Sequence, residues 1–201
     1  MKLFFSKIEL HMFSPLWASQ KKLHNAIWSV FGSGSASRPM YRVEIIPESE
    51  AIVVIVQSKG QTAPSWRGFV EQNDEHLISK VIITKEITLA PPVGAMFYFR
   101  LLGNTISRLE GNHEISIPPE EWIHSRESNG GFEILELTKV EKRPRIEVVK
   151  KSGLITYNNA LLEGHLRVTN QEKFEASLGG GVGRGKVYGM GMLSLFPAKV
   201  E

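Results

Sequence analysis

The residue best placed for chemistry is His24, which lies in the stretch LHNAIWSVFG. On a helix, Trp28 four residues later and Lys21 three residues earlier would share one side with His24. His24 also follows Leu23 at the edge of an apolar stripe, so its ring would be partly shielded from water. A partly desolvated histidine next to a cation stays neutral at pH 7, which suits a general base. The alternative is a histidine at the edge of the core that only packs on Trp28.

A second candidate is the glycine-rich run LGGGVGRGKVYGMGMLSL, residues 178–195. Gly180 to Lys186 has the Gly-x-x-x-x-Gly-Lys spacing of a nucleotide-binding P-loop. A P-loop continues with Ser or Thr and then a helix, whereas here position 187 is Val and the predicted helix precedes the loop. Two explanations remain open. The loop's N–H groups approach an anion, aided by Arg184 and Lys186, or the loop is a flexible connection with solvated basic residues.

The most basic segment is KVEKRPRIEVVKK, residues 139–151, with six basic and two acidic residues. Because it lies between two predicted strands, it could project as a hairpin or loop that follows a phosphate backbone. A solvated surface loop is the alternative. The aromatic signature of RRM proteins is absent, so base stacking on a sheet is not supported.

Composition narrows the class of protein. The chain has 201 residues, 42% of them hydrophobic and 22% charged, which suits one large domain or two smaller ones. It has no cysteine, which removes disulfides, thiol catalysis and Cys-based zinc sites and fits a reducing cytoplasm. The longest apolar run, residues 51–56, has the length of a strand, so no membrane span is expected. The net charge of +3 allows an acidic partner, and the histidine spacing matches no metal motif.

The elements that must position these residues are predicted in two similar halves, 1–90 and 91–201, with Pro91-Pro92 at the boundary. Each half follows the order βαββαβ, which is typical of a ferredoxin-like (RRM-like) domain in the α+β class. In the first half, Ser14 and Pro15 are expected to begin the helix that carries His24. The strands expected there are 4–10, 41–45, 51–56 and 81–89, with a weak second helix at 64–72.

In the second half, the basic segment falls between two strands and the glycine loop falls before the last strand. Asn170 is expected to cap the helix that precedes this loop. The strands expected are 95–102, 132–137, 160–169 and 188–195, with helices at 119–128 and 170–178. A site that uses both His24 and the glycine loop therefore draws residues from both halves of the sequence.

Several segments together resemble one family. In order they are SKIEL, LHNAIWSVFG, YRVE, IVVIVQS, FYFRLLGN, ALLEGHLRV and GGGVGRGKVYGMGMLSL. They are similar to the CasE family of CRISPR RNA-processing endoribonucleases, which belong to type I-E Cascade complexes and to the RAMP superfamily. The glycine loop alone indicates the superfamily, whereas the LHNAIWSVF helix combined with the VGRGKVYGMGMLSL ending is more specific. The resemblance implies two tandem ferredoxin-like domains and a role in antiviral defence.

The resemblance also implies metal-independent cleavage of the CRISPR repeat at the base of its hairpin, with no cofactor. The ribose 2′-OH attacks the adjacent phosphate and leaves a 2′,3′-cyclic phosphate and a 5′-OH. The protein then holds the guide RNA by its hairpin as a Cascade subunit. His24 matches the family's catalytic histidine, and the glycine loop and basic segment would hold the RNA. The residues assigned to RNA binding are Gly181, Gly183, Arg184, Gly185, Lys186, Lys142, Arg143, Arg145, Lys150 and Lys151.

One position departs from the family pattern. Well-known members have a catalytic Tyr three residues before the histidine, and here that residue is Lys21. A lysine could stabilise the phosphorane or protonate the leaving oxygen, so Lys21 is predicted to be catalytic together with His24. Since a lysine is not a phenol, a catalytically inactive subunit that only binds the guide RNA hairpin is the alternative. A nucleotide-binding protein is disfavoured because the P-loop pattern is incomplete.

Overall fold

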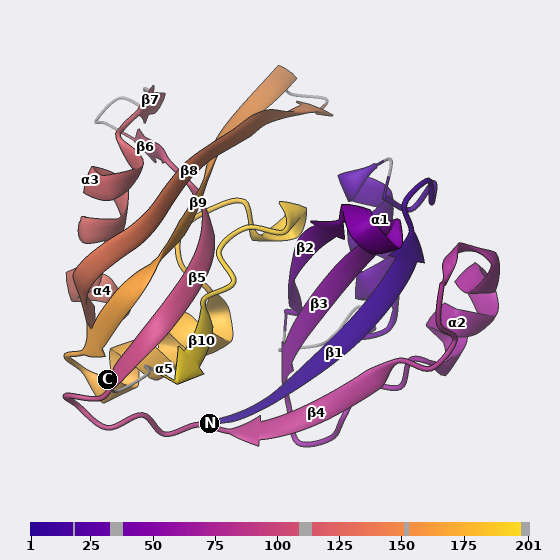
Figure 1. Cartoon of the computed structure of the whole chain (residues 1–201), viewed down its shortest axis with the longest axis horizontal. Helices are drawn as coiled ribbons and strands as arrows, with labels where there is room; N and C mark the ends of the chain where they lie inside the picture. The colour runs from indigo at the N-terminus through magenta and orange to yellow at the C-terminus, as the bar shows by residue number, and fades with distance from the viewer. Residues whose placement is uncertain (18, 33–37, 109–113, 151–152, 198–201) are drawn as a thin grey trace. The chain divides into compact units, whose positions relative to one another are not determined.

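The chain forms two units in the computed structural model, which describes all residues except 18, 33–37, 109–113, 151–152 and 198–201 (Figure 1). The side chains of 107, 108, 114, 147–150, 153 and 154 also lie outside the description. The first unit comprises Met1–Leu89 and Lys186–Gly189, and the second comprises Ala90–Gly185 and Met190–Glu201. A short segment of the glycine-rich loop therefore belongs, by its contacts, to the unit that contains His24. The domain boundary at Pro91-Pro92 stays a prediction.

The first unit is a four-stranded antiparallel sheet with two α-helices (Figure 1). The strand order is β2-β3-β1-β4, so the first and third strands of the unit lie in the centre. The elements are β1 (Lys2–His11), α1 (Gln20–Ser29), β2 (Met40–Ile46), η1 (Pro47–Ser49), β3 (Ala51–Lys59), α2 (Arg67–Asn73), η2 (Asp74–His76) and β4 (Ile83–Thr88).

Helix α1 begins later than the sequence predicts. Ser14 does not cap it, because its hydroxyl accepts a hydrogen bond from the N–H of Leu16 in a tight turn before the helix. Ser19 is the N-cap, and its hydroxyl accepts from the N–H of Lys22. The predicted apolar stripe was Leu16, Leu23, Ile27 and Val30. Leu23 and Ile27 are fully buried in the core of this unit, whereas Leu16 lies before the helix and Val30 is its C-cap. His24 is thereby fixed at the edge of the buried face.

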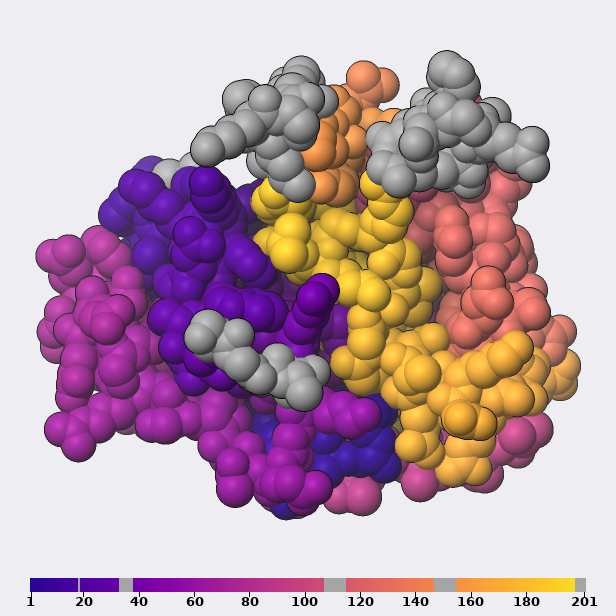
Figure 2. All heavy atoms as spheres, turned by 180° about the vertical axis from the view of Figure 1, so that it is seen from behind, coloured from indigo at the N-terminus to yellow at the C-terminus, as the bar shows by residue number. Residues whose placement is uncertain are grey.

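The second unit repeats the same plan, and its sheet order is β10-β5-β9-β8. Phe174 of the last α-helix packs on Phe97 and Phe132 and holds this helix on one face of the sheet. The outer surface of this part of the chain is the yellow-orange region of Figure 2. The elements are β5 (Met96–Asn104), β6 (Ile106–Arg108), β7 (Glu114–Ser116), α3 (Pro119–His124), α4 (Glu127–Gly130), β8 (Phe132–Lys150), β9 (Gly153–Val168), α5 (Gln171–Gly180), η4 (Lys186–Tyr188) and β10 (Ser194–Pro197).

Both units have the strand order of a ferredoxin-like fold, so the predicted α+β class with two tandem ferredoxin-like domains is confirmed. Asn170 caps α5 as predicted, since its side chain accepts from the N–H of Lys173. The predicted last strand is wrong at its beginning. Positions 186–188 form a 3-10 turn, and β10 begins only at Ser194, because Gly189 and Gly191 adopt positive φ angles that a strand does not use.

The basic segment forms part of a long hairpin made by β8 and β9. Strand β5 pairs with β9 as far as Asn159, and beyond this point the described residues of β8 and β9 continue to pair with each other (Figure 1). Of the two alternatives, a projecting hairpin is therefore the one that the structure shows. No helix in the described part of the chain is long and apolar enough to cross a membrane.

Candidate active site

His24 lies half-buried on α1, against two aromatic rings of the first unit. Its ring centroid is 5.5 Å from that of Trp28, one turn further along the helix, and 6.5 Å from that of Tyr41 on β2. Burial lowers the pKa of His24 below its usual 6.5, because the charged imidazolium loses solvation. The ring is therefore neutral at pH 7 and can accept a proton, as the sequence argument expected.

The segment Lys186–Gly189 is held next to α1 by a hydrogen bond from β2. The hydroxyl of Tyr41 donates to the carbonyl oxygen of Val187 at 3.0 Å, and the N–H of Gly189 donates to the carbonyl of Lys186 at 3.3 Å. Burial, followed by the neighbouring Tyr188, raises the pKa of Tyr41, so the phenol stays protonated and keeps donating. A Cβ at Gly189 would lie 3.2 Å from the Tyr41 ring, which shows how closely the segment packs on this side chain.

Lys186 is half-buried and has a second cation, Arg38, close enough to affect its charge. Burial lowers the pKa of Lys186, and repulsion from Arg38 lowers it further. Two cations that repel one another are both stabilised when an anion lies between them. This pair is therefore suited to a phosphate group, in the same unit as the neutral imidazole of His24.

Lys21 lies one turn before His24 on α1, and its residue is exposed. The first unit thus brings together His24, Tyr41, Lys186 and Arg38, with Lys21 on the same helix as His24. A neutral base, an exposed ammonium and a pair of cations can together move a proton and neutralise charge on a phosphate.

The remaining glycine-loop residues belong to the second unit, where backbone geometry explains the glycines. Gly183 has φ +77° and Gly185 has φ +88°, the left-handed region that favours glycine. A Cβ at Gly183 would lie 2.6 Å from the ring of Trp122, and one at Gly185 would lie 2.7 Å from Met190. The N–H of Gly181 already donates to the carbonyl of Ser177. The loop is therefore tightly packed, which argues against a flexible connection.

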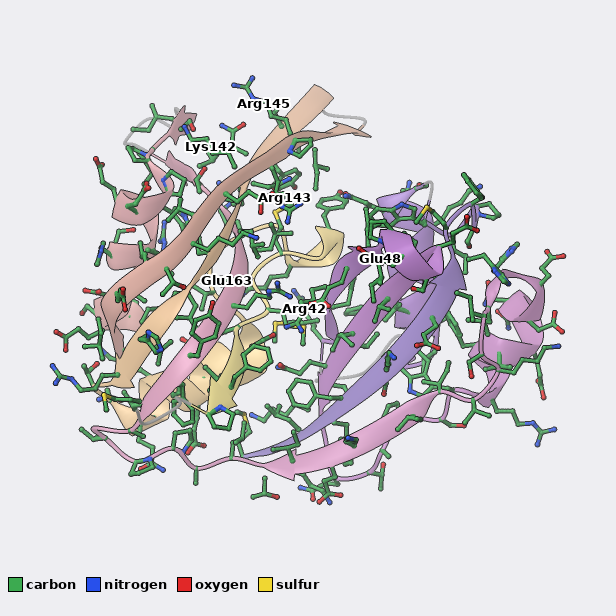
Figure 3. The ribbon with its side chains drawn as sticks, in the orientation of Figure 1. Arg42, Glu48, Lys142, Arg143, Arg145 and Glu163 are labelled. Carbon is green, nitrogen blue, oxygen red and sulfur yellow. The ribbon has the colours of Figure 1, made fainter. Side chains whose placement is uncertain are left out.

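The basic residues of the second unit lie along the β8–β9 hairpin, where Figure 3 labels Lys142, Arg143 and Arg145. All three are exposed, and Arg143 forms an ion pair with Glu141 at 3.2 Å. Lys150 pairs in register with Gly153 near the tip of the hairpin, but its side chain and all of Lys151 lie outside the described residues. The hairpin therefore presents several cations to a partner with phosphate groups.

Comparison with known proteins gives the family. Residues 3–197 match the sequence model of the family described as CRISPR associated protein. The chain belongs to this family. It is 31% identical, over 179 residues that make up 80% of each protein, to the CRISPR-associated endoribonuclease Cse3 of Thermus thermophilus. The resemblance of its sequence motifs to the CasE (Cse3) family is confirmed.

Two solved structures of this family are similar over nearly the whole chain. One is CRISPR endoribonuclease Cse3 bound to 19 nt RNA, which is 27% identical with a TM-score of 0.80. The other is Thermus thermophilus Cse3 bound to an RNA representing a pre-cleavage complex, which is 26% identical with a TM-score of 0.78. Each match covers 98% of this chain and 100% of the other.

Sequence reasoning did not identify Arg38 and Tyr41 as part of this site. Arg38 follows the GSGSAS link, where a basic residue gives no signal of its own. Tyr41 is the first residue of a predicted alternating strand, and its spacing gives no sign of a functional role. Their positions next to Lys186 and Val187 depend on a contact between distant parts of the chain, which local spacing cannot reveal.

Proposed function

We propose that this protein is a metal-independent endoribonuclease that cleaves CRISPR repeat hairpins in precursor RNA. The 2′-OH of the ribose attacks the adjacent phosphate, and the products have a 2′,3′-cyclic phosphate and a 5′-OH. The observation that carries the proposal is the neutral imidazole of His24, in one unit with the cations Lys186 and Arg38, in a chain of the Cse3 family. The reaction would take place in the cytoplasm.

His24 acts as the general base in this proposal. It accepts the proton of the 2′-OH while the new P–O2′ bond forms and the P–O5′ bond breaks. Because its pKa is lowered, His24 is largely unprotonated at neutral pH and available for this step. Its contact with Trp28 and Tyr41 limits the orientations of the ring.

Lys186 and Arg38 stabilise the negative charge that develops on the phosphorane oxygens. The leaving O5′ needs a proton, and the ammonium of Lys21 is the proposed donor on α1. Tyr41 is not a candidate for this role, because its hydroxyl is already used by the carbonyl of Val187 and its pKa is raised. It is a positioning residue for the segment that carries Lys186.

The second unit supplies the grip on the RNA. The cations of the β8–β9 hairpin (Lys142, Arg143 and Arg145, with Lys150 and Lys151 from the sequence) would follow the phosphates of the RNA at and beside its stem. Arg184 and glycines 183 and 185 would hold the RNA backbone, whereas the N–H of Gly181, also assigned to RNA binding from the sequence, is already used by Ser177. Retention of the product through these contacts would make the protein a subunit of Cascade that keeps the guide RNA. The relatives solved with RNA support this part of the proposal.

A cleavage assay on the cognate repeat RNA in EDTA tests the proposal. The expected result is cutting at one position, with a cyclic-phosphate end, in the complete absence of divalent metal. The matched control is the same RNA with a single 2′-deoxyribose at that position, which should bind equally well and remain intact. Tight binding without cutting of either RNA would contradict the enzyme and support the inactive hairpin-binding subunit, for which the replacement of the family Tyr by Lys21 is the argument.

A further inference from the structure

The second unit contains a cavity of about 470 Å³ at the base of the projecting hairpin. This volume lies in the range of about 300–1,000 Å³ that is typical of small-molecule sites. One wall is basic and comes from β8, another consists of two asparagines of β9, and a third is the apolar surface of Pro118 and Pro119. All the residues that line the cavity belong to this unit.

A β-bulge shapes the basic wall. Arg143 is opposite Asn159 and Ile146 is opposite Tyr157, so two residues of β8 face the single residue Asn158 of β9. Such a bulge bends the strand and changes the direction of its side chains. The amide nitrogen of Asn159 donates to the carbonyl of Pro144 at 3.0 Å and fixes the bulge. Lys142 and Arg143, which precede the bulge, and Arg145, which lies in it, all line the cavity.

The charge of the cavity favours an anionic ligand. Three cations line it, and Glu120 is the acidic residue among its lining residues. Arg143 shares part of its charge with Glu141. No hydrogen bond or ion pair joins Lys142 or Arg145 to another residue in the described part of the chain. Both are exposed, so a phosphate at the mouth of the cavity can reach them.

The asparagine wall contains two amide oxygens that accept no hydrogen bond from a described residue. Asn159 is 5% exposed, and its Oδ1 is buried without a hydrogen-bond partner among the described residues. The Oδ1 of Asn158 is in the same state. The backbone of Asn158 is fixed, since its carbonyl accepts from Thr105 at 2.8 Å, whereas its side chain bonds to no other described residue and can turn about its last bond. A buried acceptor without a donor costs about 1–3 kcal/mol, which a ligand with N–H groups can offset.

We propose that this cavity binds one unpaired nucleotide of the RNA beside the hairpin stem. Its phosphate lies against Lys142, Arg143 and Arg145, and its base lies on the proline wall and donates to the amide oxygen of Asn158 once that side chain has turned toward the cavity. A bare phosphate would satisfy the cations but leave the amide oxygen of Asn158 without a donor. The inference rests on the proposed function in one respect, which is that the ligand is part of the repeat RNA.

The first test couples a protein variant to an RNA variant. Each unpaired nucleotide flanking the stem is replaced in turn by an abasic ribonucleotide, which keeps the phosphate, in an RNA made uncleavable by a 2′-deoxyribose. Wild-type protein should lose about tenfold in affinity at one position, the size of one good hydrogen-bonded contact. Asn158→Ala should lose the same affinity for intact RNA and then show no further loss with that abasic RNA.

A matched pair of charge variants provides the control. Lys142→Ala removes a cation that lines the cavity, and Lys139→Ala removes one from the same strand that does not. Only Lys142→Ala should reduce the loss of affinity that the abasic nucleotide causes. If the abasic nucleotide lowers the affinity of wild type and of Asn158→Ala equally at every position, the proposal is overturned, even if the RNA is cut normally.

The second test does not need the repeat RNA. Nuclear magnetic resonance follows the side-chain amides of Asn158 and Asn159 during titration with each 5′-nucleoside monophosphate and with inorganic phosphate. Saturable shifts with at least one nucleotide, lost in Asn158→Ala, are expected. Shifts with phosphate alone, or none, would contradict a nucleotide site. This outcome is separate from the proposed cleavage, which depends on residues of the first unit.

Discussion

The hydrogen bond from Tyr41 to the carbonyl of Val187 is predicted to position Lys186 for the reaction. Tyr41 is 2% exposed, and its hydroxyl donates at 3.0 Å to the carbonyl of Val187, which is part of the glycine-rich run. Tyr41→Phe removes this donor and keeps the ring that packs near His24. The substitution therefore changes one hydrogen bond and very little packing.

The size of the effect follows from the surroundings of the bond. A typical intramolecular hydrogen bond contributes about 0.5–1.5 kcal/mol net. This bond is only partly buried, so water can replace the phenol at the carbonyl, and the lower half of the range applies. If this free energy holds Lys186 against the phosphate, single-turnover cleavage slows by about two- to fivefold, since about 1.4 kcal/mol corresponds to tenfold in rate.

The assay measures the single-turnover cleavage rate against pH, together with urea unfolding. A freer Lys186 is better solvated, so its pKa rises and the alkaline limb of the profile moves to higher pH. Tyr98→Phe is the control, because it removes a hydroxyl that contacts Glu163 and Thr138 in the second unit. An unchanged rate and an unchanged limb in Tyr41→Phe, with stability lowered, would refute the positioning role.

Three further predictions concern the same loop and the base. The pH dependence of kcat/KM should be bell-shaped. It should rise as His24 deprotonates at a pH below 6.5 and fall as Lys186 loses its proton at a lower pH than an ordinary lysine does. A rising limb above pH 6.5 would contradict this prediction. Lys186→Ala should slow cleavage about 10- to 100-fold, and Lys186→Arg should restore most of the rate if charge is what matters; equal loss in both would contradict that reason. Gly183→Ala should lower the free energy of unfolding by about 1–3 kcal/mol, because the residue has a positive φ and the new Cβ would clash with Trp122. Gly180 has open space around it, so Gly180→Ala should change the free energy of unfolding by less than about 0.5 kcal/mol.

Much of the fold could be predicted from local patterns. The buried stripe of Leu23 and Ile27 and the N-cap at Asn170 are local features, and both are found as expected. The predicted beginning of α1 was wrong because the pair Ser14-Pro15 is typical of a helix N-terminus and also of a turn. Only the tertiary contacts of the preceding segment decide between the two.

The site was predictable only in part. His24 could be found from its spacing and its polar position beside an apolar stripe. Arg38 and Tyr41 could not, because the approach of Lys186–Gly189 to these residues joins segments that are far apart in the sequence. The glycine-rich loop gave an ambiguous signal for a similar reason. Gly183 and Gly185 are explained by packing against Trp122 and Met190, which no sequence pattern indicates.

The role of His24 as general base is the central claim, and its replacement tests it most directly. Cleavage of the cognate repeat RNA would be measured in EDTA with wild type and with His24→Ala, while binding is followed in parallel. We expect unchanged binding and a cleavage rate that is lower by about 10²–10⁴, the usual contribution of a general base. Cleavage by His24→Ala at the wild-type rate, with the same cyclic-phosphate product, would contradict it.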